Sequence, residues 1–258
     1  MNRESLQQFQ KMIDSHSRIV FFGGAGVSVA SGIPDFRSAD GLYNNRGVEF
    51  ENYEPEYLLS RTCLYREPKV FYEFYRQKLD TRGVEPNVTH YKLAELERAG
   101  KMVGIVTQNI DGLHQRAGSE RVFEIHGTTM RNYCHACGRV FPGDYIFKYF
   151  DGLTPESGPD AIIPRCDKCG GMVRPAVTLY EESLPEDAVR GAIDAIASAD
   201  MMIIAGTSLV VYPAAGMVDY FHGDTIVLIN KGVTSRDRYA DLVIRDPMED
   251  VFSEIVVR

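Results

Sequence analysis

Four of the five cysteines stand in two C-x-x-C pairs, Cys134 with Cys137 and Cys166 with Cys169, and 28 residues separate the pairs. Each pair is followed by a glycine, which suits a tight turn that presents both thiolates on one side. Four thiolates match the tetrahedral coordination of zinc and leave no position open for a substrate, so the spacing predicts a structural zinc site. Two unrelated pairs of free thiols, or a redox dithiol, are the alternatives. We expect Cys63, outside the pairs, to be an ordinary buried residue.

A second group of residues that could take part in ligand binding is the glycine-rich turn GGAGVS at 23–28. This turn follows the apolar run 19–22. Glycines placed after a first strand let backbone N–H groups approach a phosphate closely. The turn nevertheless matches neither the G-x-G-x-x-G pattern nor the P-loop, which ends in G-K-[ST]. Taken alone, it is equally consistent with a simple tight turn.

Three further polar clusters follow apolar runs that have the length of strands; they occupy 107–114, 206–208 and 230–231. Any one of them alone would be typical of an ordinary loop. Because the carboxyl ends of parallel strands meet at one edge of a sheet, we expect these clusters and the glycine-rich turn to lie together. The sequence therefore predicts a dinucleotide cleft at that edge.

The elements that would position these clusters alternate between short apolar strands and amphipathic helices, which predicts an α/β fold with a Rossmann-like parallel sheet covered by helices on both faces. We expect strands over 18–22, 102–106, 201–205, 225–229 and 241–244, and helices over 4–15, 89–99, 185–198 and 210–220.

The domain organisation follows from where this alternation stops. The stretch 131–173 holds both cysteine pairs and has no clear helical period, so we expect a small zinc-binding module inserted into one large domain. The large domain would comprise 1–130 and 174–258, with an irregular, flexible lobe at 38–60.

Composition excludes several protein classes. The chain has 258 residues and a formal net charge of −8, and a nonspecific nucleic-acid binder needs a basic excess that this chain lacks overall. No apolar run is long enough to span a bilayer, and we see no targeting segment. We expect a cytoplasmic protein, where C-x-x-C pairs are more often metal ligands than disulfides.

The motifs together resemble those of one family. GAGVSVASGIPDFRS, TQNIDGLHQRAG, EIHG, the two cysteine pairs and GTSLVVYPA occur in the order seen in sirtuins, and the resemblance covers about residues 5–255. Sirtuins are NAD-dependent protein-lysine deacylases with a large Rossmann-like domain and a small zinc module, and the peptide binds between them. The resemblance thus implies NAD as co-substrate, one structural zinc per chain and an acyl-lysine protein or peptide as partner.

The resemblance also implies roles for individual residues. His126 is similar to the family's catalytic base, acting together with Asn109. The positions similar to NAD contacts are Gly24, Ala25, Gly26, Val29, Phe36, Arg37, Gln108, Asn109, Ile110, Asp111, His126, Gly206, Thr207, Ser208, Asn230 and Met248. In the family's mechanism the acyl-lysine amide oxygen attacks the nicotinamide ribose, nicotinamide leaves, and a base activates a ribose hydroxyl. Histidine titrates near neutrality and suits that task.

The expected peptide contacts are Val177, Tyr180 and Val211. The chain departs from the family here, because many relatives have Phe-Gly-Glu where it has Tyr180, Glu181 and Glu182. We hypothesise that the added charge of Glu181 favours substrates with basic residues beside the target lysine.

Acyl preference is a separate prediction. Relatives that remove succinyl groups carry a Tyr-x-x-Arg pair; Tyr75 stands where that Arg would follow Tyr72, and Tyr43 with Arg46 has the spacing but lies too early. Without a placed Arg an acidic acyl group lacks its bidentate partner, so we expect a deacetylase.

Several alternatives remain open at this point. They are a deacylase for longer or acidic acyl groups, a mono-ADP-ribosyltransferase using the same NAD site, a noncatalytic NAD sensor, and a zinc-ribbon nucleic-acid module. We expect a monomer that binds neither specific nucleic acid nor membrane.

Overall fold

The computed structural model describes residues 2–154, 156–158 and 160–258. The chain forms two compact units, each assembled from separated stretches of sequence. The first unit comprises Met1–Asp35, Val84–Ile125 and Pro185–Arg258, and the second comprises Phe36–Gly83 and His126–Leu184.

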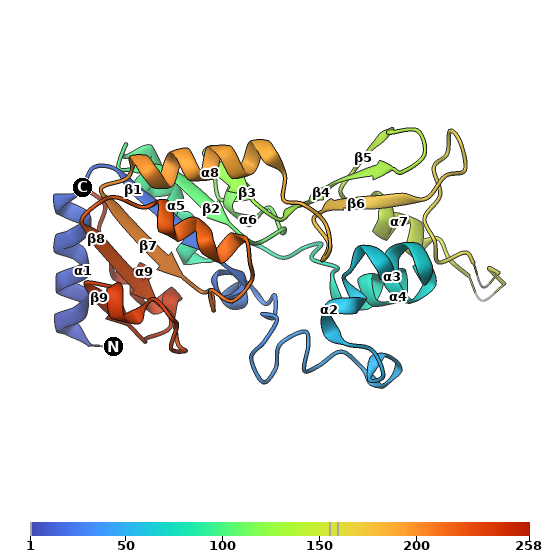
Figure 1. The fold of residues 1–258 in the computed structure, drawn as a ribbon, viewed down its shortest axis with the longest axis horizontal. Coiled ribbons are helices and arrows are strands. Elements are labelled where there is room, and N and C mark those ends of the chain that lie inside the picture. Colours follow the sequence, from blue (N-terminus) through green and yellow to red (C-terminus); the bar gives the residue numbers. More distant parts are fainter. Residues whose placement is uncertain (1, 155, 159) are drawn as a thin grey trace. The chain divides into compact units, whose positions relative to one another are not determined.

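The first unit is built on a six-stranded sheet in which every pair of neighbouring strands is parallel (Figure 1). The strand order is β3-β2-β1-β7-β8-β9, so the chain adds strands on one side of β1 and then on the other. This is the Rossmann order, and it confirms the expected fold class. The strands are β1 Ile19–Gly23, β2 Met102–Thr107, β3 Val122–Glu124, β7 Met201–Ala205, β8 Thr225–Ile229 and β9 Leu242–Ile244.

Helices cover both faces of this sheet because alternate strand residues point to opposite sides. Ile105 packs in the main core with Leu93 of α5 and Phe9 of α1. Its neighbour Gly104 faces the other way, where a Cβ atom would meet Ala195 of α8. The helices of this unit are α1 Arg3–Ser15, α5 Val88–Arg98, α6 Leu113–Arg116, α8 Glu186–Ser198 and α9 Met248–Glu254 (Figure 1).

In the first unit, the expected and observed elements differ mainly in three places; no helix or strand was expected in the second unit. The run 210–220 forms a 3-10 helix, Ala214–Tyr220, rather than an α-helix. Strand β3 and helix α9 were not expected. Other 3-10 turns lie at Ala25–Val27, Val29–Ser31, Val48–Phe50 and Asp237–Tyr239.

The second unit contains a three-stranded antiparallel sheet of order β5-β4-β6 and, among its described residues, the helices α2, α3, α4 and α7 (Figure 1). Both cysteine pairs lie in this unit. Its elements are α2 Pro55–Leu58, α3 Arg61–Arg66, α4 Pro68–Lys78, β4 Gly127–Cys134, β5 Val140–Pro142, α7 Tyr145–Asp151 and β6 Val173–Val177.

The stretch 38–60, expected as a flexible lobe, groups with 126–184 in this unit. Leu42, Tyr43 and Phe50 within it are buried against Leu58 and Phe74. The stretch therefore shares a small core with α4, and its mobility stays a prediction. Within the part of the chain that the structure describes, no helix combines the length and the apolar character needed to cross a membrane.

Candidate active site and metal centre

The four polar clusters meet at the carboxyl edge of the six-stranded sheet, as the sequence predicts. Gln108, after β2, donates its backbone N–H to the carbonyl of Gly23 at 3.0 Å and its side-chain amide to Thr207 Oγ1 at 2.9 Å. Gly206, after β7, donates its N–H to the carbonyl of Ile229 at 3.1 Å. Hydrogen bonds thus join the ends of β1, β2, β7 and β8 into one continuous edge.

Glycine is required where two of these turns cross. A Cβ atom on Gly26 would lie 2.7 Å from the Cα of Gly206, and one on Gly24 would lie 2.8 Å from the Gly206 carbonyl. Gly206 itself has a φ of +61°, in the left-handed region that favours glycine. The glycine-rich turn therefore packs backbone to backbone against the end of β7, which fixes where its N–H groups lie.

The centre of this edge holds a buried polar trio. Ser28 Oγ donates to Asp111 Oδ2 at 2.6 Å, and Asn109 Nδ2 donates to Ser28 Oγ at 2.9 Å. The three side chains belong to residues that are at most 8% exposed. The second carboxylate oxygen of Asp111 accepts the N–H of Leu113 at 2.9 Å. Asn109 and Asp111 were expected site residues; Ser28 was not, although it lies within the GAGVS motif that drew attention to the turn.

Two buried histidines lie near the trio, since Asp111 is close enough to act on His90 by its charge. His90 and His114 have ring centroids 4.8 Å apart and are at most 1% exposed. Burial lowers the pKa of His90 to about 4, although the charge of Asp111 opposes this shift. Burial, reinforced by His90, also lowers the pKa of His114 well below its usual value. Both rings are therefore neutral at pH 7.

The outer strands carry the residues expected at the adenosine end. Asn230 donates its N–H to the Ile244 carbonyl at 3.1 Å, and its side-chain amide to the Gly232 carbonyl at 3.0 Å. Arg245 donates to the carbonyl oxygens of Asn230 at 2.8 Å and Gly232 at 2.6 Å, which holds this turn in place. Met248 begins α9 and packs in the main core.

The remaining expected contacts of the first unit differ in exposure. Thr207 is buried, Ala25, Ile110 and Val211 are half-buried, and Val29 and Ser208 are exposed.

The second unit carries the candidate base. His126 is half-buried and comes directly before β4. Its backbone carbonyl accepts the N–H of Thr178 at 2.8 Å, so the segment after β6 runs beside it. The next residue, Gly127, has a φ of +74°, and a Cβ atom there would collide with the carbonyl of Ala176. Glycine therefore lets the two strands close up at the position that follows His126.

The same unit holds the other expected residues of the lobe and the peptide segment. Phe36 lies edge-on to Tyr43, with ring centroids 5.4 Å apart, and the guanidinium of Arg37 lies 5.5 Å from the centre of the Tyr43 ring. Val177, the last residue of β6, is buried, and Tyr180 is half-buried. Asn109 and Val211 belong to the first unit, whereas His126, Val177 and Tyr180 belong to the second.

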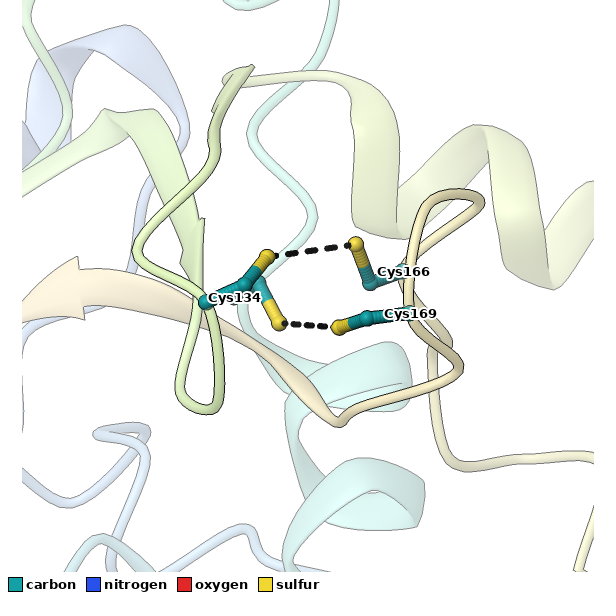
Figure 2. A group of neighbouring side chains, drawn as sticks. Cys134, Cys166 and Cys169 are labelled. Atoms are coloured by element: carbon teal, nitrogen blue, oxygen red, sulfur yellow. Dashed lines mark hydrogen bonds between the residues drawn. The ribbon is translucent and has the colours of Figure 1, made fainter.

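The four paired cysteines form the candidate metal centre. Their sulfur atoms all lie within 4.8 Å of one another. The Sγ atoms of Cys134 and Cys169 are 3.5 Å apart (Figure 2). Those of Cys137 and Cys166 are 3.8 Å apart. A tetrahedron with zinc–sulfur bonds of about 2.3 Å has sulfur–sulfur edges of about 3.8 Å. The donor set therefore fits a four-thiolate zinc ion.

Cys63 lies outside this cluster, is fully buried and belongs to α3. Burial, helped by the charge of Glu67, raises the pKa of its thiol to about 12. A thiol with so high a pKa is neither a nucleophile nor a metal ligand at neutral pH, which agrees with the structural role that the sequence suggests.

Comparison with known proteins gives a consistent result. The profile of the Sir2 family matches residues 24–213. The chain is 47% identical to an NAD-dependent protein deacetylase of Clostridium acetobutylicum over 253 residues, which is 98% of each chain. It is 48% identical to the NAD-dependent protein deacetylase of Clostridium perfringens over 255 residues, 98% of this chain and 99% of the relative.

A solved Sir2 structure with a deacetylated p53 peptide and 3′-O-acetyl ADP-ribose superposes with a TM-score of 0.84 at 32% identity, covering 96% of both chains.

Proposed function

This chain belongs to the Sir2 family, and on that premise we propose that it is an NAD-dependent protein-lysine deacetylase. It would convert acetyl-lysine, NAD and water into lysine, nicotinamide and O-acetyl-ADP-ribose. The observation that carries the proposal is the buried trio of Ser28, Asn109 and Asp111 at the carboxyl ends of the strands. A buried carboxylate and amide that share one serine hydroxyl form a fully bonded polar network, which supports a specific arrangement for a polar ligand at this edge.

The first unit would bind NAD. The backbone N–H groups of the turn at Ala25 and Gly26 would receive the phosphates, as helix-start and glycine-rich turns do. Asp111 and Ile110 would hold the nicotinamide carboxamide, and Thr207, Ser208 and Asn230 would hold the adenosine. The Arg245 guanidinium supports that end, because it fixes both carbonyls of the turn that carries Asn230.

The second unit would supply the base and the peptide site. His126 would remove a proton from a ribose hydroxyl, since an imidazole titrates near neutral pH. Asn109 would position the groups around the reacting carbon. The peptide would add as a strand beside the segment after β6, with Val177 and Tyr180 beside the target lysine. Val211, which belongs to the first unit, stays a predicted peptide contact.

The zinc ion would be structural. Four thiolates fill a tetrahedral coordination sphere, so the ion holds the two turns together and has no place for a reactant. We further propose that the enzyme acts in the cytoplasm, because a reducing compartment keeps such thiolates available to a metal. The monomeric state stays a prediction.

The structure supports acetyl over acidic acyl groups. Tyr72 and Tyr75 are both buried, and Tyr72 donates its hydroxyl to the Val173 carbonyl at 2.7 Å. Arg46, the other arginine considered, donates to the backbone carbonyls of Tyr43 at 2.7 Å and Phe50 at 3.2 Å. It is thus committed to the lobe backbone and offers no free guanidinium to a succinyl carboxylate.

A panel of peptides that differ only in the acyl group tests this function. We expect NAD-dependent loss of the acetyl group with one nicotinamide released per lysine, and slower turnover of the succinyl peptide. A mass gain of one ADP-ribose on the protein substrate would favour the transferase instead, and faster removal of succinyl would overturn the acyl assignment.

A further inference from the structure

The segment that follows β6 is attached to the lobe by three kinds of bond. The backbone contributes first: Tyr180 donates its N–H to the Leu59 carbonyl and accepts the N–H of Arg61, each at 3.0 Å. These two bonds form a parallel bridge between Ser60 and Tyr180. The lobe thus lies along the segment at Tyr180. At Thr178 the segment instead donates its backbone N–H to the carbonyl of His126.

The side chain of Glu181 supplies the second attachment. Its Oε2 accepts the N–H of Thr62 at 2.9 Å and the hydroxyl of Thr62 at 2.6 Å. Thr62 lies in the first turn of α3, where N–H groups lack helical partners and favour an anion. Glu181 has a φ of +72°, in the left-handed region that disfavours side chains. The bonds to Thr62 offset that backbone strain.

The third attachment joins two hydroxyl groups. Tyr43 and Tyr180 bring their Oη atoms to 2.8 Å, and Tyr43 is only 7% exposed. Burial, together with this bond, raises the pKa of Tyr43, so its hydroxyl keeps its proton. The ring of Tyr43 also touches Phe36 and faces Arg37, and its backbone N–H binds the Phe36 carbonyl at 3.0 Å. The hydroxyl pair therefore links the segment after β6 to the loop that carries Phe36 and Arg37.

These attachments link residues that are expected to bind two different ligands, the cofactor and the peptide. Phe36 and Arg37 are expected cofactor contacts, and Tyr180 is an expected peptide contact. We propose that Tyr43 and Tyr180 are positioning residues that couple the two ligands, so that a bound peptide favours the arrangement of Phe36 and Arg37 that receives the cofactor. The inference rests on the proposed function of the site.

Such coupling is reciprocal in binding free energy, since each ligand must shift the affinity of the other by the same factor. A neutral hydrogen bond contributes about 0.5–1.5 kcal/mol net, so the hydroxyl pair accounts for a factor of about five. The effect falls on the coupling between ligands, which a merely structural tyrosine would leave unchanged.

ADP-ribose is a suitable probe because it has no nicotinamide to lose. Its dissociation constant is measured by calorimetry with and without a saturating acetyl-lysine peptide, for the full chain and for Tyr43→Phe and Tyr180→Phe. We expect the peptide to tighten ADP-ribose binding at least about fivefold in the unaltered chain, and each variant to lose that factor. Tyr53→Phe is the matched control, because Tyr53 packs on the same lobe core and donates its hydroxyl to Glu67 at 3.1 Å. It should keep the coupling.

Two Tyr→Phe variants that both retain the full coupling factor would overturn the inference, as would an unaltered chain whose two ligands bind independently. The proposed function is tested by a separate measurement, which is NAD-dependent deacetylation by the unaltered chain. An active chain without coupling contradicts only the inference, and an inactive chain contradicts the function on which it rests.

Discussion

Ser28 donates its hydroxyl proton to the carboxylate of Asp111 at 2.6 Å, although 83 positions separate the two residues. The same serine oxygen accepts the amide of Asn109. One small hydroxyl therefore fixes the two polar side chains on which the expected nicotinamide and ribose contacts depend.

Replacing Ser28 by alanine should leave the side chains of Asn109 and Asp111 less firmly held, because both lose their hydrogen bond to the serine hydroxyl. A buried polar group left short of a partner costs about 1–3 kcal/mol, so we expect the KM for NAD to rise roughly tenfold and kcat to fall. Steady-state kinetics with varied NAD measure this. Ser31→Ala is the control, since the Ser31 hydroxyl accepts a bond from Asn87 in the same turn region. Equal KM values for the two variants would contradict the role of Ser28.

The buried histidine pair predicts how stability depends on pH. Both rings have a lowered pKa in the folded chain, so below about pH 6.5 the unfolded chain binds protons that the folded chain does not. The free energy of unfolding should therefore fall as the pH drops from about 6.5 towards 4, by up to about 1.4 kcal/mol per pH unit for each histidine.

Urea unfolding of His114→Leu tests this dependence. Among the residues that the structure describes, neither ring nitrogen of His114 has a hydrogen-bond partner, so leucine removes a titrating group without orphaning another. We expect the slope of the unfolding free energy against pH, between pH 6 and pH 5, to decrease by about 1.4 kcal/mol per pH unit in this variant. His222→Leu, at an exposed position, should keep the original slope. An unchanged slope in His114→Leu would show that the pair does not titrate as proposed.

Loss of the metal should unfold the second unit. Structural four-thiolate sites contribute binding free energies of about 10–16 kcal/mol to folding, and Cys137→Ser removes one ligand. We expect the zinc-to-protein ratio to fall from near one to near zero, with a large loss of thermal stability. Cys63→Ser, outside the cluster, should keep its zinc. A Cys137→Ser chain with full zinc content would refute the site.

The charge of Glu181 predicts a preference among peptides. Its carboxylate binds Thr62 but remains exposed, so it should favour basic residues beside the target lysine. Peptides with flanking Arg should turn over faster than those with flanking Asp, and high salt should shrink the difference. Glu181→Gln removes the charge and keeps an acceptor for Thr62, so it should shrink the difference too. Equal rates at low salt would dismiss the hypothesis.

Much of the first unit is predictable because most of its strands are short and consist mainly of apolar residues. The runs 201–205 and 225–229 match β7 and β8 residue for residue. The meeting of their polar ends follows from parallel topology alone, which is why the edge could be anticipated before any contact was known.

What the sequence does not reveal depends on tertiary contacts. Strand β3 has three half-buried residues and too little pattern to be recognised. The role of Ser28 requires two partners from a different strand end. The grouping of 36–83 with 126–184 rests on bonds such as that between Tyr180 and Leu59, for which neither residue carries a local signal.

The most direct test of the proposed activity is the mass change of an acetyl-lysine peptide incubated with the full chain, with and without NAD, and with His126→Ala. The account predicts loss of one acetyl group only when NAD is present, matched by nicotinamide release, and at least a hundredfold slower loss for His126→Ala, about the value of one general base. Deacetylation without NAD, or at an unchanged rate in His126→Ala, would contradict it.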